Sequence, residues 1–172
     1  NLSVIVVNNK NIRKSVRREI AKLGNKANLN HIDTSSVTNM QGLFSKGWGR
    51  NFNGDISDWN VEDVENMEYM FRRSKFNSDI SKWDVSNVRT MDSMFKTSVF
   101  DQDISKWDVS RVENMKEMFK RSVFDQDISK WDVSRVENMK EMFKRSQFNG
   151  DISKWLAPSE YNDGEFALKN TK

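Results

Sequence analysis

A repeat of 24 residues dominates this chain of 172 residues. Residues 103–126 and 127–150 are nearly identical copies, and related copies occupy 55–78 and 79–102. A more divergent copy near 29–54 is three residues longer, and residues 151–156 begin a partial copy. A period of this length predicts a solenoid, in which each unit buries its apolar side only against its neighbours.

The apolar residues of one unit predict a strand followed by a short helix. Ile56, Trp59 and Val61 follow the pattern L-x-x-L-x-L, which places Trp59 and Val61 inward and Asn60 outward. Apolar residues then recur at helical spacing. The expected fold is therefore an α/β repeat solenoid with one short parallel strand and one short helix per unit. The helical set is Val64, Met67, Met70 and Phe71.

Bulky apolar residues recur at repeat positions, which indicates that they form the core. Every Met and five of the six Trp residues lie at such positions. A sulfur–aromatic ligand box is the alternative, but strand and helix spacing favours packing. The expected structural core includes Trp59, Trp83, Trp107, Trp131, Trp155, Met67, Met91, Met115 and Met139.

Both ends of the chain depart from the repeat. Residues 1–28 begin with one more strand pattern and continue into an amphipathic helix that Gly24 can cap. We interpret 1–28 as an N-terminal strand–helix cap, 29–156 as the repeat region and 157–172 as a C-terminal cap or tail. The apolar positions of the helix are Ile12, Val16, Ile20 and Leu23.

The composition excludes several kinds of site. With no cysteine and a single histidine, the chain cannot form disulfides, thiolate metal sites or multi-histidine metal sites. No phosphate-cradling glycine loop, G-x-S-x-G or H-E-x-x-H motif occurs, and no apolar run is long enough for a transmembrane segment. We therefore expect a non-enzymatic protein without a cofactor. His31 occupies an outward repeat position and is expected at the surface.

The outward positions of the expected strand form charged rows. The rows of Lys and Asp alternate, so they can simply compensate one another across the strands. Alternatively, they form a flat, repeating surface suited to a glycan or a fibrous protein. The residues of this candidate binding surface are Asp58, Asn60, Lys82, Asp84, Lys106, Asp108, Lys130, Asp132 and Lys154.

Another row of acids precedes each expected strand. Asp101 and Asp103 put two carboxylates two residues apart, which invites a calcium site. Because no glycine-rich ligand loop accompanies them, turn capping is favoured and no metal site is expected. The row consists of Asp55, Asp79, Asp103, Asp127 and Asp151.

Two features outside these rows are further candidates. Trp48 lies in the insertion of the first repeat, as an exposed loop anchor or as a filler at the cap. The basic side of the N-terminal helix is either solvated or binds an anionic surface, and no nucleic-acid motif accompanies it. Nucleic acid is therefore disfavoured as a partner. The candidate anion-binding residues are Arg13, Lys14, Arg17 and Arg18.

The repeat contains the run W-D-V-S-x-V-x-N-M-x-x-M-F followed by F-x-x-D-I-S, whole in several copies. With the L-x-x-L-x-L pattern, this motif resembles the BspA-like leucine-rich-repeat surface proteins of mycoplasmas over about residues 29–155. The resemblance implies a parallel-strand solenoid, a cell-surface or secreted location, and adhesion or protein binding. Members of that family carry Asn or Cys three residues after the last apolar residue of the strand. This chain carries Val at that position, so the ladder of asparagine side chains is absent. Those positions are Val64, Val88, Val112 and Val136.

The leading functional prediction is a module that binds a protein or glycan at a bacterial surface. A structural spacer or scaffold for another domain is the first alternative. An intracellular effector or immunity protein, which binds an anionic polymer through the basic helix, is the second. No residue pattern identifies the ligand or indicates the oligomeric state.

Overall fold

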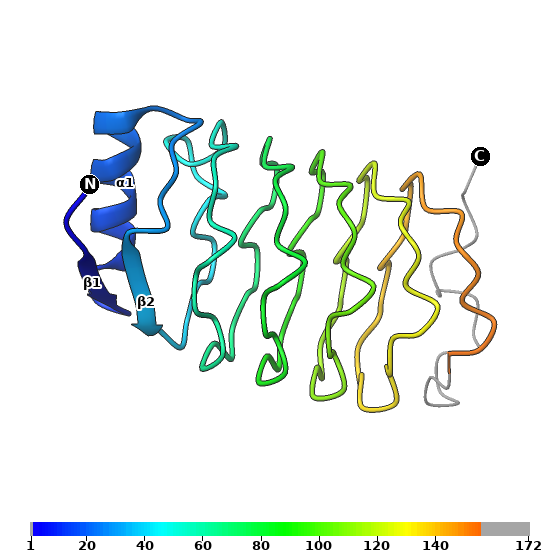
Figure 1. The fold of residues 1–172 in the computed structure, drawn as a ribbon. Helices are drawn as coiled ribbons and strands as arrows, with labels where there is room; N and C mark the ends of the chain where they lie inside the picture. The colour runs from blue at the N-terminus through cyan, green and yellow to red at the C-terminus, as the bar shows by residue number, and fades with distance from the viewer. Residues whose placement is uncertain (1, 156–172) are drawn as a thin grey trace.

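The computed structural model of the chain describes residues 2–155. It begins with strand β1 (Ile5–Asn8), helix α1 (Ile12–Leu23) and strand β2 (Ile32–Ser36), which lie together at the N-terminal end of the molecule (Figure 1). The two strands pair in parallel, with Ile5 opposite Ile32, so α1 is the crossover between them. The C-terminal cap or tail expected at 157–172 lies outside the described residues.

Helix α1 forms where the apolar spacing predicts it. Ile12, Val16 and Ile20 are buried, and the basic residues between them are exposed. Gly24 ends the helix with φ of 90°, a conformation that favours glycine, and its N–H donates to the carbonyl of Ile20 at 2.8 Å. Across residues 2–155, no helix combines the length and the apolar character that crossing a membrane requires.

After β2 the chain forms successive windings that lie side by side along one axis (Figure 1). Parallel backbone bridges join each repeat to the next. The first two pairs are 27 residues apart because of the three-residue insertion, and the other three pairs are 24 apart. The period of the sequence is therefore the period of the structure. The bridges are Asn28–Asp55, Asn39–Asn66, Asn66–Thr90, Thr90–Asn114 and Asn114–Asn138.

The prediction of a short helix in each repeat is wrong. Residues 67–74, for example, form consecutive tight turns. Their N–H groups alternate between two kinds of partner. Met67, Tyr69, Phe71 and Arg73 donate to carbonyls of the next repeat at 2.9–3.1 Å. Met70, Arg72 and Ser74 donate to the carbonyl three residues back, at 3.0–3.3 Å.

These turns satisfy the same apolar spacing as a helix, since both bring an inward side chain back after about three residues. A helix this short is marginal in water and would give the neighbouring repeat no backbone partners. The turns use every N–H from Met67 to Ser74, with Glu68 bonded to the side chain of Asn66 at 2.9 Å. They require left-handed backbone at Tyr69 and Arg73, each with φ of 57°.

The strand expected around residues 56–61 also differs from the structure. Trp59 and Val61 are buried and Asn60 is exposed, but no strand is assigned between residues 37 and 155. The backbone ladder runs instead through residues 65–73 and their equivalents. In the tryptophan segment, each indole N–H bonds to a backbone carbonyl of the preceding repeat, as Trp83 does to Ile56 at 3.0 Å.

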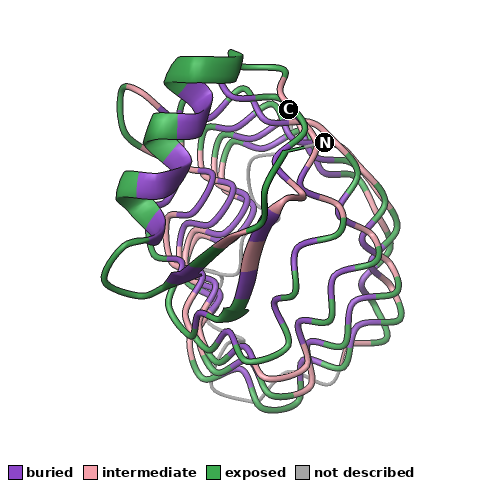
Figure 2. Ribbon diagram, turned by 60° about the vertical axis from the view of Figure 1, so that its left-hand side comes forward, coloured by how far each residue is buried: buried purple, intermediate pink, exposed green. Residues whose placement is uncertain are grey.

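The core consists of stacked columns of like residues, and the buried positions recur from winding to winding (Figure 2). Centroids of adjacent rings in one phenylalanine column are 5.6–5.8 Å apart. Trp59, Trp83, Trp107 and Trp131 are 3–4% exposed, and Trp155 is partly buried. The column contains Phe71, Phe95, Phe119 and Phe143, and the methionines beside it are Met67, Met91, Met115 and Met139.

Candidate functional site

The residues of the candidate binding surface all lie outside the core. The four lysines of the row are exposed and form no ion pair with any residue between 2 and 155. The polar residues beside them are exposed too. The structure therefore brings the predicted surface together as parallel rows along the windings. The lysines are Lys82, Lys106, Lys130 and Lys154, and their neighbours are Asp58, Asn60, Asp84, Asp108 and Asp132.

The aspartates of this surface also fix the conformation of the backbone turns that follow them. Asp84 Oδ1 accepts a hydrogen bond from the N–H of Ser86 at 3.0 Å, and Asp108 and Asp132 make the same bond in the next two repeats. The hydrogen bonds from Ser86 lower the pKa of Asp84. Its carboxylate therefore stays charged at neutral pH, in a position fixed by the turn.

The second acid row caps turns in the same way. Asp55 Oδ1 accepts from the N–H of Ser57 at 2.9 Å. This bond recurs at 2.8–2.9 Å at Asp79, Asp103, Asp127 and Asp151. The turn-capping interpretation is therefore confirmed for this row. No group of three or more acidic or histidine side chains in the described part of the chain is arranged to hold a metal ion.

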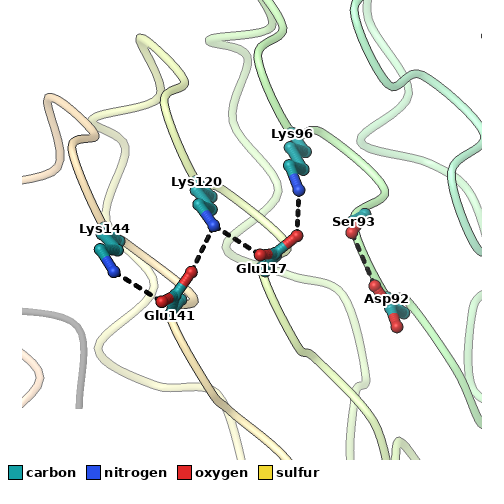
Figure 3. Close-up of polar contacts among 7 residues, drawn as sticks. All are labelled: Asp92, Ser93, Lys96, Glu117, Lys120, Glu141 and Lys144. Atoms are coloured by element: carbon teal, nitrogen blue, oxygen red, sulfur yellow. Dashed lines mark hydrogen bonds and ion pairs between the residues drawn. The ribbon is translucent and has the colours of Figure 1, made fainter. Parts of the chain in front are cut away.

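A ladder of ion pairs crosses three repeats and was not recognised in the sequence (Figure 3). Lys120 Nζ bonds to Glu117 Oε1 at 2.5 Å and also to Glu141. Glu117 in turn binds Lys96, and Glu141 binds Lys144 at 2.6 Å. Hydrogen bonds from Lys120 and Lys144 lower the pKa of Glu141 to about 2. Three lysines thus alternate with two glutamates, and we call this group the Lys–Glu ladder.

The signal for the ladder is present in the sequence. Glu-x-x-Lys occurs at 117–120 and again at 141–144, one repeat later. Under a helix interpretation, this spacing indicates only pairs within one repeat. The stacked turns bring Lys120 next to Glu141 of the following repeat as well. The ladder therefore follows from the winding, which the apolar spacing alone does not distinguish from a helix.

The four candidate anion-binding residues of α1 are all exposed, but they do not share partners. Arg13 reaches the first repeat and donates to the carbonyls of Gln41 at 2.7 Å and Gly42 at 3.2 Å. Arg18 Nε pairs with Glu19 at 3.4 Å. Among described residues, no hydrogen bond or ion pair involves the side chains of the other two, Lys14 and Arg17.

The expectation that His31 lies at the surface is wrong. Its side chain is 10% exposed, and Nε2 lies 3.1 Å from Oε2 of Glu19, whose side chain is 5% exposed. Because Glu19 belongs to helix α1, the helix covers the outward position of His31. Burial raises the pKa of Glu19, but the hydrogen bonds with His31 and Arg18 outweigh it, so the net pKa is lowered.

Trp48 is half-buried and packs against the core. The insertion folds back closely, because a Cβ on Gly49 would lie 2.9 Å from the Cα of Phe44. This packing favours the filler interpretation of Trp48 over that of a free anchor.

Comparison with known proteins identifies one family. The model described as Mycoplasma protein of unknown function, DUF285, matches residues 11–122 and again 76–171. Overlapping matches are expected where repeats align in more than one register. No curated protein and no solved structure matches the chain. Because the two matches together span most of its length, the chain belongs to DUF285, a repeat family of Mycoplasma proteins of unknown function.

Proposed function

We propose that this chain is a non-enzymatic binding module, whose repeats form a leucine-rich-repeat-like solenoid that presents a charged surface to a protein or glycan. One observation carries the proposal. Lys82, Lys106, Lys130 and Lys154 are exposed, recur once per repeat and lack ion pairs within residues 2–155. Each lysine lowers the pKa of the turn-capping aspartate three residues before it, but it does so from beyond ion-pair distance. Its ammonium group therefore stays available to a partner outside the protein.

The Lys–Glu ladder provides the contrast that makes this observation informative. The same windings place Lys120 between Glu117 and Glu141, so that its charge is compensated inside the protein. Lys106 lies in the same repeat and has no carboxylate within ion-pair distance in the described structure. The fold can therefore hold its lysines in direct ion pairs, and in the row of Lys106 it does not.

Binding through this surface requires several repeats at once. An exposed ion pair contributes only about 0–1 kcal/mol, so one lysine gives little affinity. A row on a rigid backbone acts together when its partner carries charges at several matching places. The neighbouring row of Asp84, Asp108 and Asp132 would repel a densely charged polyanion. The surface therefore favours a protein or a sparsely charged glycan over DNA.

The proposed setting is adhesion at a cell surface. It is supported by the resemblance of the repeat to BspA-like leucine-rich-repeat surface proteins. Membership in a family of Mycoplasma repeat proteins is consistent with this setting.

The test is a binding screen of the purified chain against arrayed matrix proteins and glycans, with DNA as an anionic control, at two salt concentrations. The diagnostic variant is Lys106→Gln with Lys130→Gln. The matched control is Lys10→Gln with Lys75→Gln, which removes the same charge from exposed positions outside the row. Gln147 occupies the position of Lys75 in a later repeat, so the fold accepts glutamine there.

We expect saturable binding to a protein or glycan at physiological salt, about tenfold weaker in the diagnostic variant and nearly unchanged in the control. Equal weakening by both variants would show that net charge, not the row, determines binding. Binding only to DNA that disappears at higher salt would contradict the proposal and favour the basic helix as the binding element.

A further inference from the structure

A pocket of about 370 Å³ opens where α1 meets the first two repeats. Five cationic side chains line it and no carboxylate does. A volume in this range is sufficient for a small ligand. The cations, which we call the basic pocket, are Arg13 from α1, Lys46 and Arg50 from the first repeat, and Arg72 and Arg73 from the second.

Arg72 is the position at which the pattern of the Lys–Glu ladder fails. Later repeats place Lys96, Lys120 and Lys144 at this position, next to Glu117 and Glu141. The two corresponding positions around Arg72 hold Tyr69 and Ser93, which carry no negative charge at neutral pH. Within the described structure, Arg72 Nε is buried and has no hydrogen-bond partner. A buried donor without a partner is costly. The guanidinium carbon of Arg72 lies 5.5 Å from the centroid of the Tyr69 ring. Within residues 2–155, no hydrogen bond uses the terminal N–H groups of Arg72, which are left for an anion in the pocket.

Two of the other arginines are held in place by the backbone. Arg13 donates to the carbonyls of Gln41 and Gly42, and Arg50 Nε donates to the carbonyl of Ser45 at 2.9 Å. These bonds use part of each guanidinium and leave its other N–H groups available. Lys46 and Arg73 are exposed and form no ion pair within residues 2–155. The pocket therefore combines fixed donors with adaptable ones.

The acids nearest to the pocket are bonded elsewhere. Glu68 accepts hydrogen bonds from Gln41 Nε2 and Thr90 Oγ1, both at 3.0 Å, and Asp92 accepts from Ser93 Oγ at 2.6 Å. The charge of Asp92, with burial and Glu68, raises the pKa of Tyr69, although Arg72 partly offsets it. Tyr69 therefore keeps its proton and can donate a hydrogen bond into the pocket.

Three of the five cations come from parts of the chain that do not repeat. Lys46 and Arg50 flank Gly47, Trp48 and Gly49 in the insertion, and Arg13 belongs to the cap. Later repeats within residues 2–155 therefore lack the residues that complete this pocket.

We propose that the basic pocket binds the phosphate or sulfate group of a small monoester. Guanidinium groups bind such oxyanions through paired hydrogen bonds, and the three terminal oxygens of a phosphate or sulfate monoester can contact several of them at once. This site is independent of the lysine row proposed above, so either one can fail without the other.

The experiment is calorimetric titration at constant ionic strength. The probes are inorganic phosphate, inorganic sulfate, glucose 6-phosphate and glucose 6-sulfate, with glucose as the neutral control. The diagnostic variants are Arg72→Gln and Lys46→Gln. Lys46 is an exposed insertion residue, so its variant tests the pocket without risk to the core. Arg17→Gln is the matched control, because Arg17 lies on the same basic helix as Arg13 but does not line the pocket.

We expect one molecule of at least one ester to bind per chain, with glucose inactive. Affinity should fall about tenfold or more in Arg72→Gln and severalfold in Lys46→Gln, and less than twofold in Arg17→Gln. The preference between the two esters identifies the group. Binding of the inorganic ions alone would overturn the proposal for a monoester. No binding of any probe, or equal losses in all three variants, would overturn the pocket as a site.

Discussion

The indole N–H of Trp107 donates a hydrogen bond to the backbone carbonyl of Ile80, 3.1 Å away and 27 residues earlier. The same bond joins Trp83 to Ile56 and Trp131 to Ile104. The sequence predicts a strand around each tryptophan, and strands would join the repeats there through backbone hydrogen bonds. In the structure, the tryptophan side chain joins them instead. Each of these tryptophans both fills the core and gives a carbonyl of the preceding repeat a second hydrogen bond, beside the one from a backbone N–H of that repeat.

This relationship predicts different losses for two substitutions of Trp107. Trp107→Phe keeps an aromatic ring but removes one of the two hydrogen bonds that the carbonyl of Ile80 accepts, the other coming from the N–H of Trp83 at 3.2 Å. The loss of this one bond should cost about 0.5–1.5 kcal/mol of unfolding free energy. Trp107→Ala also removes buried volume and should cost about 3–5 kcal/mol. Urea unfolding of each variant measures both values, with the half-buried Trp48→Phe as a milder control. A loss below about 1 kcal/mol for Trp107→Ala would contradict the role of this tryptophan in the core.

Much of the N-terminal cap and of the core could be predicted from the sequence. The spacing of Ile12, Val16 and Ile20 predicts α1, since in that segment the helix is long enough to show several turns of one face. The periodic Trp, Met and Phe residues predict the buried columns, because a side chain repeated at one place in every unit meets its own copies.

The backbone conformation of each repeat could not be predicted in the same way. Apolar residues at Val64, Met67 and Met70 fit a helix and a run of turns equally well. What distinguishes them is where the N–H groups bond, which depends on the neighbouring repeat. The burial of His31 depends likewise on α1 packing over it. The basic pocket was missed because its residues come from three separate segments.

The Lys–Glu ladder predicts a pH-dependent contribution from Glu141. Its pKa is lowered from the ordinary 4.5 to about 2, so the stabilisation is fully present above pH 4.5 and is lost as the pH falls towards 2. Glu141→Gln should therefore reduce stability at pH 7 by about 1 kcal/mol, a value modest because water screens partly exposed pairs. Near pH 2 the variant and the parent should converge. Urea unfolding at pH 7, 4 and 2 measures the difference, and the exposed Glu137→Gln should show almost none.

The left-handed turns predict an unusual preference at Arg121, which is exposed and has φ of 56°. Arg121→Asn should raise the melting temperature slightly, because asparagine tolerates this conformation better than most residues. Arg121→Val should lower it, with a cost of about 1–2 kcal/mol, because a β-branched residue is strained there. Thermal unfolding followed by circular dichroism distinguishes the two. The reverse order would be incompatible with the turn conformation.

The pair of Glu19 and His31 should behave as a coupled unit that fixes α1 to the first repeat. Each side chain is largely buried and bonded to the other at 3.1 Å, so Glu19→Ala or His31→Ala leaves its partner without that bond. Each single substitution should cost about 1–3 kcal/mol, and the double variant should cost less than their sum, since it leaves no unpaired partner. Because the pKa of Glu19 is lowered, its contribution is present above pH 4.5 and declines in acid. The coupling energy from urea unfolding should therefore decline as the pH is lowered below 4.5. Strict additivity at pH 7 would mean that the contact contributes nothing to holding the helix in place.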